Sequence, residues 1–547
     1  MTSPLAPEGL LAPAIPSPAL EDLVLGEVLS SRARSHGDET FLRFRDGELT
    51  YREVDLAADR LAAGLAGQGV GPGDHVALML PNSADMVELV FALARLGAIA
   101  VPINTAYKGD LLRHVLDSSD ATSLIVDAEY LDRVAEVAGR VDDLRFVAVR
   151  GGDRLSLDRF PVPAMTYSRL TSTRSELPQV EVAFSDTQAI MYTSGTTGRS
   201  KGAIVPHSLA LICALDSLRF VSGGSRTIYC PLPLFHAAGL WDGMMAALLS
   251  GASIAIVERF SASRFWDDVR HFDAQTAMGV FSMIPILLNQ PPTPSDRDNP
   301  LQTFYMGKSS LDAPFYERFG AHTVETYTST EAGIATASPY GEWRVGSMGQ
   351  AHSERFQVAV VDEHDRAVPP GEPGELVLRP RQPHVITGGY YGRDDVTAAC
   401  FRNMWFHTGD RAYADGDGYF YFLDRMKDAI RRRGENISAF DMECEINLHP
   451  GVLECAAIGV PSELEEEEVK VVVVRRPGSD LEASELAAYC AERLPAFMIP
   501  RYIEFVDTLP RTPTGKVAKH QLRAMGDHGL TAATWDGGSR RGNEKAG

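Results

Sequence analysis

The sequence predicts an α/β fold in two parts: a large N-terminal domain of parallel-rich sheets with helices plus a β-rich subdomain, and a small, mobile α+β domain at the C-terminus. The chain has 547 residues, more than one hydrophobic core of ordinary size accommodates. Apolar runs alternate with helix-like stretches over residues 51–282, as in parallel sheets covered by helices. After about residue 349, shorter strand-like runs lie between Gly, Pro and Asp turns.

The individual elements follow from these patterns. Residues 51–65 carry apolar side chains at helical spacing and predict a helix. Eight apolar runs predict buried strands in the large domain: 75–80, 99–103, 123–126, 146–149, 189–192, 227–231, 253–257 and 276–282. Strands at 358–361, 375–378 and 418–423 are expected in the β-rich subdomain, which covers about 345–423.

A charged segment over residues 424–434 separates the two domains. Beyond it we expect strands at 455–460, 468–475 and 501–506 and a helix at 482–494. The predicted organisation is therefore a flexible lead over 1–22, a large domain over 23–423, a hinge at 424–427, a small domain over 428–525 and a disordered tail over 526–547.

Charge and composition exclude several classes of partner. The chain has 73 acidic and 52 basic residues and a formal net charge of -21. Such a surface repels nucleic acid, so we expect no nucleic-acid partner. The most apolar stretch, residues 89–103, contains Arg95 and is too short to cross a bilayer, so we expect no membrane insertion. Six scattered cysteines without a CxxC pair indicate reduced thiols and a cytoplasmic location.

The most specific local signal is a loop that follows the apolar run at 189–192. It reads Thr193-Ser194-Gly195-Thr196-Thr197-Gly198-Arg199-Ser200-Lys201-Gly202. Its glycines let backbone N–H groups approach a ligand, its hydroxyls add donors and Lys201 adds a positive charge, which together predict a phosphate cradle. The spacing differs from that of a Walker A loop. An ordinary surface loop would seldom carry so many donors directly after a buried strand.

This loop resembles the signature of the adenylate-forming superfamily, which includes acyl- and aryl-CoA synthetases, peptide-synthetase adenylation domains and luciferases. Five further segments resemble the motifs of that superfamily in the same order: 231–236, 325–331, 405–410, 424–428 and 510–516. Alone, each segment is as typical of solvated surface or core as of a site. Together they make the chain similar, over about residues 23–525, to AMP-dependent acyl-CoA synthetases, with motifs nearest to carnitine/crotonobetaine-type ligases.

The resemblance implies the nucleotide-binding residues. Tyr327 would stack on adenine, Asp410 would hold both ribose hydroxyls and Arg425 would reach ribose or phosphate. Arg431 lies among three arginines that would meet the phosphates of coenzyme A. The phosphates of ATP would be bound by Thr193, Ser194, Gly195, Thr196, Thr197, Gly198 and Lys201.

The resemblance also implies the catalytic residues. Lys516 would bridge the substrate carboxylate and the α-phosphate, and Thr330 would contact both groups. Glu331 would hold Mg²⁺, with Thr193 beside it. His236 would border the acyl pocket and contribute to catalysis, and Lys427 would be the hinge residue of the small domain.

Two positions depart from the superfamily pattern, and both lie where the substrate is expected. Thr328 stands where Gly is usual, so its side chain should narrow the pocket. Gly307, Lys308 and Ser309 stand where a small-residue turn is usual, and Lys308 is unexpected there. We hypothesise that Lys308 or Ser309 pairs with a polar or anionic group of the substrate; a solvent-facing Lys308 is the alternative.

The implied activity uses ATP, Mg²⁺ and coenzyme A. A small carboxylic acid becomes an acyl-adenylate with release of pyrophosphate, and the acyl group then passes to coenzyme A. One alternative keeps adenylation but changes the acceptor, as in an amide-forming ligase of secondary metabolism or an enzyme that activates nitrite to diazotise an aryl amine. A carrier-protein-loading enzyme is less favoured because no carrier domain is attached. A non-catalytic nucleotide sensor would be expected to lack Lys516 or Glu331. The identity of the acid and the oligomeric state stay open, with a homodimer among the alternatives.

Overall fold

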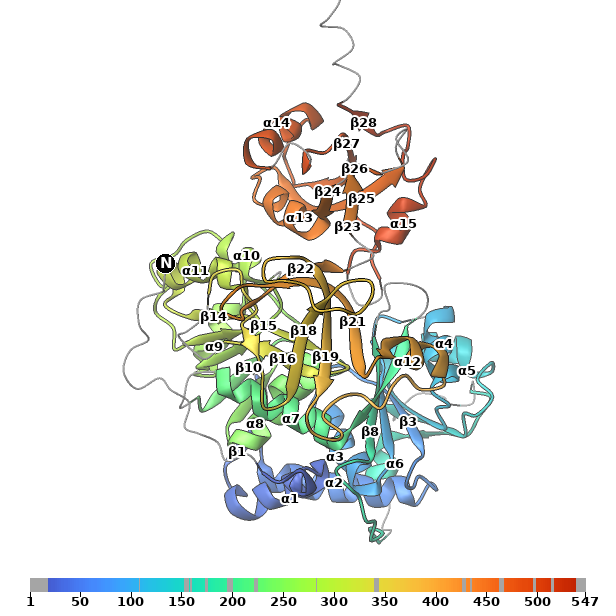
Figure 1. Cartoon of the computed structure of the whole chain (residues 1–547). Coiled ribbons are helices and arrows are strands. Elements are labelled where there is room, and N and C mark those ends of the chain that lie inside the picture. The colour runs from blue at the N-terminus through green and yellow to red at the C-terminus, as the bar shows by residue number, and fades with distance from the viewer. Residues whose placement is uncertain are drawn as a thin grey trace, which may run out of the picture. The chain divides into compact units, whose positions relative to one another are not determined.

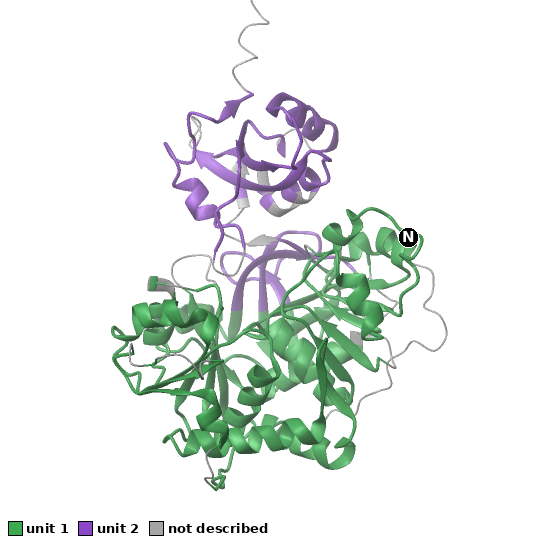
Figure 2. Cartoon of the chain, turned by 180° about the vertical axis from the view of Figure 1, so that it is seen from behind, with its two compact units in different colours: residues 1–358, 378–406, 417–420 green, residues 359–377, 407–416, 421–547 purple. Residues whose placement is uncertain are grey.

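The computed structural model describes most of the chain: residues 18–107, 109–151, 157, 160–172, 176–193, 200–220, 225–281, 283–338, 344–425, 429–432, 435–461, 467–494, 498–512 and 516–537. The chain divides into two compact units, coloured separately in Figure 2. Unit 1 comprises residues 1–358, 378–406 and 417–420, and unit 2 comprises 359–377, 407–416 and 421–547. No helix in the described ranges is long and apolar enough to span a membrane.

The first large sheet of unit 1 has seven strands in the order β7-β6-β5-β3-β4-β8-β9. All neighbours pair in parallel except β8 and β9, which form an antiparallel hairpin. All five residues of β3 are buried, which explains why this strand reads as a continuous apolar run. The strands are β3 (His75–Met79), β4 (Ile99–Pro102), β5 (Ser123–Asp127), β6 (Phe146–Arg150), β7 (Ala164–Thr166), β8 (Thr187–Thr193) and β9 (Lys201–Pro206).

The second large sheet also has seven strands, in the order β14-β13-β12-β10-β11-β1-β2. Only β1 and β2 pair antiparallel. The strands are β1 (Thr40–Phe44), β2 (Gly47–Thr50), β10 (Thr227–Cys230), β11 (Ser253–Ile256), β12 (Thr276–Met278), β13 (Thr303–Tyr305) and β14 (His322–Val324). The run predicted as one strand over 276–282 ends as a strand at Met278. Gly279 packs so tightly on Phe304 that an added Cβ would lie 2.1 Å from the ring, and the chain turns away there.

Helices cover these sheets. Helix α2 (Tyr51–Ala66) begins with a capping box in which Thr50 and Glu53 exchange hydrogen bonds, and it ends within one residue of the predicted helix. It packs against α1 (Leu25–His36) and α3 (Ala84–Leu96), and Figure 1 shows the three side by side. Helix α7 (His207–Ser217) is buried along its whole length, and it packs against a π-helix, η4 (Ala238–Met245).

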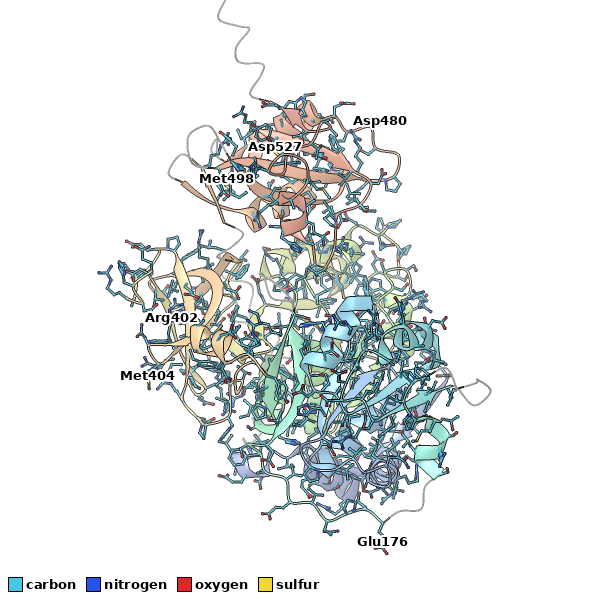
Figure 3. The ribbon with its side chains drawn as sticks, turned by 90° about the vertical axis from the view of Figure 1, so that its right-hand side faces the viewer. Glu176, Arg402, Met404, Asp480, Met498 and Asp527 are labelled. Carbon is cyan, nitrogen blue, oxygen red and sulfur yellow. The ribbon has the colours of Figure 1, made fainter. Side chains whose placement is uncertain are left out.

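The β-rich subdomain predicted after residue 345 is present as a five-stranded sheet. Its strands are β18 (Phe356–Val361), β19 (Gly374–Pro380), β20 (Phe401–Arg402), β21 (Trp405–Ala414) and β22 (Phe420–Arg425), and parts of β18, β19, β21 and β22 fall in each unit. The turn between β20 and β21 puts Asn403 and Met404 at positive φ. Figure 3 shows Arg402 and Met404 at the molecular edge, where Met404 is 83% exposed.

Within unit 2, the C-terminal sheet has the order β25-β26-β27-β28. It consists of β25 (Val452–Pro461), β26 (Glu467–Arg475), β27 (Tyr502–Val506) and β28 (Trp535–Asp536), with α13 (Ala439–Asn447) and α14 (Ala483–Arg493) packed beside it. The sequence predicted a disordered tail from 526, and this is wrong for residues 526–537. Trp535 packs on the apolar core, and Asp536 forms an ion pair with Arg501 at 3.1 Å, so this segment adds an edge strand.

A buried ion pair links the two central strands of this sheet and gives a stability prediction. Lys470 and Glu504 are in contact, and their side chains are 2% and 8% exposed. We expect Lys470→Met to lower the free energy of unfolding of the C-terminal sheet by about 3–5 kcal/mol, because it leaves a buried carboxylate without its cation. Urea denaturation followed by tryptophan fluorescence measures this. Arg493→Gln is the control: its half-exposed side chain pairs with Glu492 and Glu445 and lies over the Tyr489 ring, and its loss should cost clearly less, about 1 kcal/mol. Equal stability of the two variants would contradict the prediction.

Candidate functional site

The predicted phosphate loop connects β8 to β9 within a hairpin. Thr193 ends β8, Lys201 begins β9, and the two residues are register partners. Five predicted phosphate ligands lie outside the described residues: Ser194, Gly195, Thr196, Thr197 and Gly198. Gly202 lies on β9, where an added Cβ would be 2.4 Å from the Ile190 side chain of the paired strand β8. The hairpin therefore fixes the two ends of the loop side by side.

Glu331 lies against this hairpin. Its Oε1 accepts a hydrogen bond from the Tyr390 hydroxyl at 2.8 Å, and the Thr193 hydroxyl lies 3.5 Å from the same oxygen. Lys201 reaches over Tyr390, with its Nζ 5.6 Å from the ring centroid. The structure thus brings three predicted residues together, Thr193, Lys201 and Glu331, and it adds Tyr390, which sequence reasoning missed.

Tyr390 is placed by a short segment that pairs with β9. Gly388 N–H donates to the Ile204 carbonyl at 3.0 Å, and Ile204 N–H donates to Gly389 at 2.9 Å. Gly389 has φ +113°, and a Cβ there would lie 2.6 Å from Thr397, so only glycine fits. The backbone of Tyr390 is held by the Thr397 hydroxyl at 2.9 Å. The Gly-Gly-Tyr-Tyr run was the sequence signal that could have pointed to Tyr390. It was missed because the strand that pairs with this run, β9, lies far away in the sequence.

This arrangement fits Mg²⁺ shared with phosphate oxygens. The ion usually takes one or two protein carboxylates and fills its remaining positions with phosphate oxygens and water. Glu331 supplies one carboxylate and Thr193 a hydroxyl at the end of the loop. In the described ranges no group of three or more His, Cys, Asp or Glu side chains could hold a metal without such help.

The turn that carries Tyr327, Thr328 and Thr330 begins with β15 (Thr326–Ser329). Tyr327 is 8% exposed, and the chain turns sharply after it, with the Ser329 hydroxyl accepting from Ala332 N–H at 3.1 Å. The Thr328 hydroxyl lies beside the thiol of Cys213 on α7. Burial raises the pKa of that thiol well above its usual value, and Thr328 opposes the rise. The Thr328 hydroxyl therefore points toward α7, and its narrowing of a substrate pocket stays a prediction.

The unusual turn at Gly307, Lys308 and Ser309 is braced from within. Ser309 Oγ and its N–H both donate to Glu325 Oε2, at 2.7 and 2.9 Å, and the same Oγ accepts from Gly346 N–H at 2.8 Å. Burial raises the pKa of Glu325 despite the bonds from Ser309. The Ser309 hydroxyl is thus engaged with the protein. Lys308 is half-buried with its Nζ 5.6 Å from the Phe281 ring, so of the two hypothesised residues it is the better placed to meet a substrate.

His236 precedes the π-helix η4. Its N–H donates to the Pro233 carbonyl at 3.2 Å, and its own carbonyl accepts from Leu240 at 3.0 Å. The imidazole packs edge-on against Phe235, with ring centroids 4.6 Å apart. π-Helical turns are rare and often mark functional sites.

In unit 2, Asp410 lies within strand β21, and the residues just before it are bound by Glu375 of β19. The carboxylate of Glu375 accepts from His407 at 2.8 Å and from Gly409 N–H at 3.1 Å. Gly409 has φ +71°, which favours glycine between Thr408 and Asp410. The Thr408 hydroxyl accepts from Asp410 N–H at 3.1 Å and so fixes the aspartate backbone.

The remaining predicted residues also belong to unit 2. Lys516 is exposed, and its carbonyl accepts from Thr512 N–H at 2.7 Å. Arg425 ends β22 and Arg431 lies on β23 (Ala429–Arg432), but their side chains are outside the described part. The proposed hinge residue, Lys427, lies outside the described residues.

The sequence matches the model of the AMP-binding enzyme family over residues 29–391 and that of the AMP-binding enzyme C-terminal domain over residues 441–516. The chain belongs to the AMP-binding enzyme family. This AMP-binding enzyme is 34% identical over 506 residues to a feruloyl-CoA synthase of Amycolatopsis sp, covering 91% of the chain and 98% of the relative. It is 30% identical over 514 residues to the crotonobetaine/carnitine–CoA ligase of Salmonella typhi, again covering 91% and 98%.

Solved structures agree with these relatives. The anthranilate CoA ligase AuaEII in complex with anthranoyl-AMP superposes on the AMP-binding enzyme with a TM-score of 0.83 and 25% identity, covering 93% of this chain and 98% of that one. The O-succinylbenzoate coenzyme A synthetase from Bacillus subtilis, in complex with ATP and magnesium ion, gives a TM-score of 0.78 at 25% identity and covers 91% and 99%. The predicted family, fold and enzyme class, an AMP-forming acid–CoA ligase that uses ATP, Mg²⁺ and coenzyme A, are confirmed.

The hydroxyl of Tyr390 gives a prediction about Mg²⁺ use by the AMP-binding enzyme. Tyr390→Phe removes the 2.8 Å hydrogen bond to Glu331 but keeps the ring under Lys201. A hydrogen bond to a charged group contributes about 1.5–3 kcal/mol, so we expect at least a roughly tenfold loss of kcat/KM for MgATP. We also expect a higher Mg²⁺ concentration for half-maximal activity.

The matched control for this variant is Tyr391→Phe, which loses a hydroxyl bonded to Asp120 at 2.8 Å and should leave Mg²⁺ dependence unchanged. Identical Mg²⁺ titrations of the two variants would rule out a positioning role for Tyr390.

Proposed function

We propose that this enzyme converts a small carboxylic acid and ATP to an acyl-adenylate and pyrophosphate, and then transfers the acyl group to coenzyme A, with the residue roles given below. The observation that carries the proposal is the meeting of Thr193, Lys201, Glu331 and Tyr390 at the end of the β8–β9 hairpin.

In the first half-reaction, a carboxylate oxygen of the acid attacks the α-phosphorus of ATP, and the bond to pyrophosphate breaks. Such a displacement depends on positioning and charge neutralisation more than on acid–base chemistry. Lys201 and the hydroxyl-rich loop would hold the phosphates, and Lys516 would meet the carboxylate and the α-phosphate. Bound Mg²⁺, held by Glu331 and Thr193, would neutralise charge on the phosphate oxygens. Tyr327 and Asp410 would hold adenine and ribose.

In the second half-reaction, the thiolate of coenzyme A attacks the acyl carbonyl carbon, and AMP leaves with the oxygen that joined the two groups. Rotation about Lys427 would withdraw Lys516 and present the segment around Arg431 to coenzyme A. The exposure of the Lys516 side chain is compatible with a residue that reaches the site only part of the time.

A small aromatic or polar acid is the proposed substrate. Support comes from the relatives, which are named for feruloyl-CoA and for crotonobetaine or carnitine, and from the structure holding anthranoyl-AMP. Thr328, in place of the usual glycine, disfavours a bulky acyl chain. A cytosolic location and a homodimer also belong to this proposal, and sedimentation velocity tests the assembly.

The test is pyrophosphate release from ATP with a panel of benzoates, cinnamates, short aliphatic acids and nitrite, with and without coenzyme A. Release that needs an acid and gives a thioester with coenzyme A supports the proposal. If pyrophosphate is released with nitrite and an aryl amine but with none of the carboxylic acids in the panel, the diazotising alternative replaces this proposal.

A further inference from the structure

Asp242 is a buried carboxyl group in the π-helix η4, and nothing in the proposed mechanism uses it. The residue is 3% exposed. Burial raises the pKa of its carboxyl group to about 7, and the thiol of Cys213, 3.3 Å from Oδ1, is the one described group that opposes this rise. A thiol is a weak donor, so the carboxyl group is poorly compensated by the protein.

Other buried aspartates of unit 1 differ in this respect. Asp216 is paired with Arg355 at 3.1 Å and with His352 at 3.3 Å. Asp268 is in contact with Arg45 and accepts from the Tyr229 hydroxyl at 2.9 Å. In the described part of the chain, no Lys, Arg or His forms an ion pair with Asp242. A purely structural role therefore explains Asp216 and Asp268 better than it explains Asp242.

A short chain of contacts leads from Asp242 to the site. Cys213 donates to Asp242 and lies beside the Thr328 hydroxyl. Thr328 is three residues before Glu331, whose carboxylate contacts Thr193 and Tyr390. Asp242 is thus two side-chain contacts inward from the turn that carries the proposed carboxylate-binding residue, Thr330.

Two further buried polar groups lie near this chain of contacts, the Tyr305 hydroxyl and Thr326 Oγ1; they lie beside each other, and neither has a well-formed hydrogen bond to another described residue. Tyr305 is fully buried, and Thr326 is 5% exposed. Burial raises the pKa of the Tyr305 hydroxyl, and the nearby Asp242 and Cys213 add to this rise through their charges. A hydroxyl can donate one hydrogen bond and accept others, so the Tyr305 hydroxyl can serve a further polar group besides Thr326.

We propose that Asp242, Tyr305 and Cys213 form a polar subsite beneath Thr328 that binds an amino or hydroxyl substituent of the acid. A hydroxyl or a neutral amine would donate to the Asp242 carboxylate and accept from the Tyr305 hydroxyl, and an ammonium group would donate to the carboxylate only. The substrate class is therefore a small acid with a hydrogen-bond donor at the end away from its carboxylate. This inference rests on the proposed function, because it places the acid between Thr330 and Asp242.

The experiment compares matched acids that differ only in this substituent. Amino-, hydroxy-, methoxy- and unsubstituted benzoates and cinnamates are used, together with 4-aminobutyrate, 4-hydroxybutyrate and butyrate. Pyrophosphate release gives kcat/KM for each, and equilibrium binding of the same acids to the enzyme with AMP is measured by calorimetry. We expect kcat/KM for the best donor-bearing acid to exceed that for its unsubstituted and methoxy counterparts by at least about tenfold. An acid without the donor would leave the polar atoms of the subsite unpaired.

Asp242→Asn should reduce this preference several-fold in both kcat/KM and affinity. Asp268→Asn is the matched control: it alters a buried aspartate already paired to Arg45, so it should lower stability and keep the preference. A thermal melt of each variant identifies any that fails to fold, in which case Cys213→Ala and Tyr305→Phe serve for the same comparison.

The outcomes separate this inference from the proposed function. Release with some acids but no donor preference, or a preference unchanged in Asp242→Asn, overturns the subsite and leaves the ligase reaction standing. Failure of every acid to support release overturns the proposed function and the subsite with it.

Discussion

Lys516→Ala is expected to lower the rate of acyl-adenylate formation by about 10²–10³-fold, the size of effect found when one preorganised electrostatic donor is removed from a transition state. The lysine would meet the negative charge of both the attacking carboxylate and the α-phosphate. Its side chain is exposed, and its carbonyl keeps the bond from Thr512 N–H in the variant, so folding should be unaffected. Single-turnover formation of the adenylate measures the loss.

The two half-reactions distinguish a catalytic role of Lys516 from a general defect. When the acyl-adenylate is supplied, Lys516→Ala should form the thioester at nearly the normal rate, because the lysine would act only in adenylation. Lys519→Ala is the control, because this nearby lysine forms an ion pair with Glu443 at 2.9 Å. Equal loss in both half-reactions, or normal adenylation, would contradict the assigned role.

Glu331→Gln should reduce kcat/KM for MgATP by a similar factor, about 10²–10³. The amide keeps the size of the side chain and can still accept from Tyr390, but it removes the charge that would hold Mg²⁺. The apparent Mg²⁺ affinity in the presence of ATP should therefore fall, and a titration of activity and of ATP binding against Mg²⁺ measures it. This loss should exceed that of Tyr390→Phe, since the hydroxyl removed in that variant would act only through Glu331.

A surface carboxylate provides the comparison for Glu331. Glu354 is 67% exposed in its side chain and pairs with Arg219 at 3.1 Å, so Glu354→Gln should keep normal Mg²⁺ dependence. If Glu331→Gln and Glu354→Gln titrate alike, the metal role of Glu331 is wrong.

Strands buried on both faces and helices with a regular apolar face were predictable from the sequence, because their apolar patterns are compatible with few other local structures. β3 begins at the predicted residue and ends one residue early, at Met79, and α2 ends one residue after the predicted Leu65. Segments whose conformation depends on contacts with residues far away in the sequence were not predictable in this way. The order of residues 526–537 depends on Trp535 packing against the core and on Asp536 pairing with Arg501, neither of which a Gly- and Arg-rich composition reveals.

The same limit applies to the site. Thr193, Lys201 and Glu331 carried a motif and could be named. Tyr390 could not, because its contact with Glu331 depends on a segment that pairs with β9 across nearly two hundred residues of sequence. Asp242 and Cys213 are 29 positions apart on different helices, and only their packing makes the carboxyl group conspicuous.

The most direct test of the central claim follows the oxygen atoms. A carboxylic acid that is a substrate, labelled with ¹⁸O in both carboxylate oxygens, is incubated with the enzyme, ATP, Mg²⁺ and coenzyme A. The masses of the products are measured by mass spectrometry. Attack of the carboxylate on the α-phosphorus predicts AMP carrying one ¹⁸O per turnover, unlabelled pyrophosphate and a thioester that keeps the other ¹⁸O. Unlabelled AMP, or label in inorganic phosphate accompanied by ADP, would contradict an acyl-adenylate intermediate.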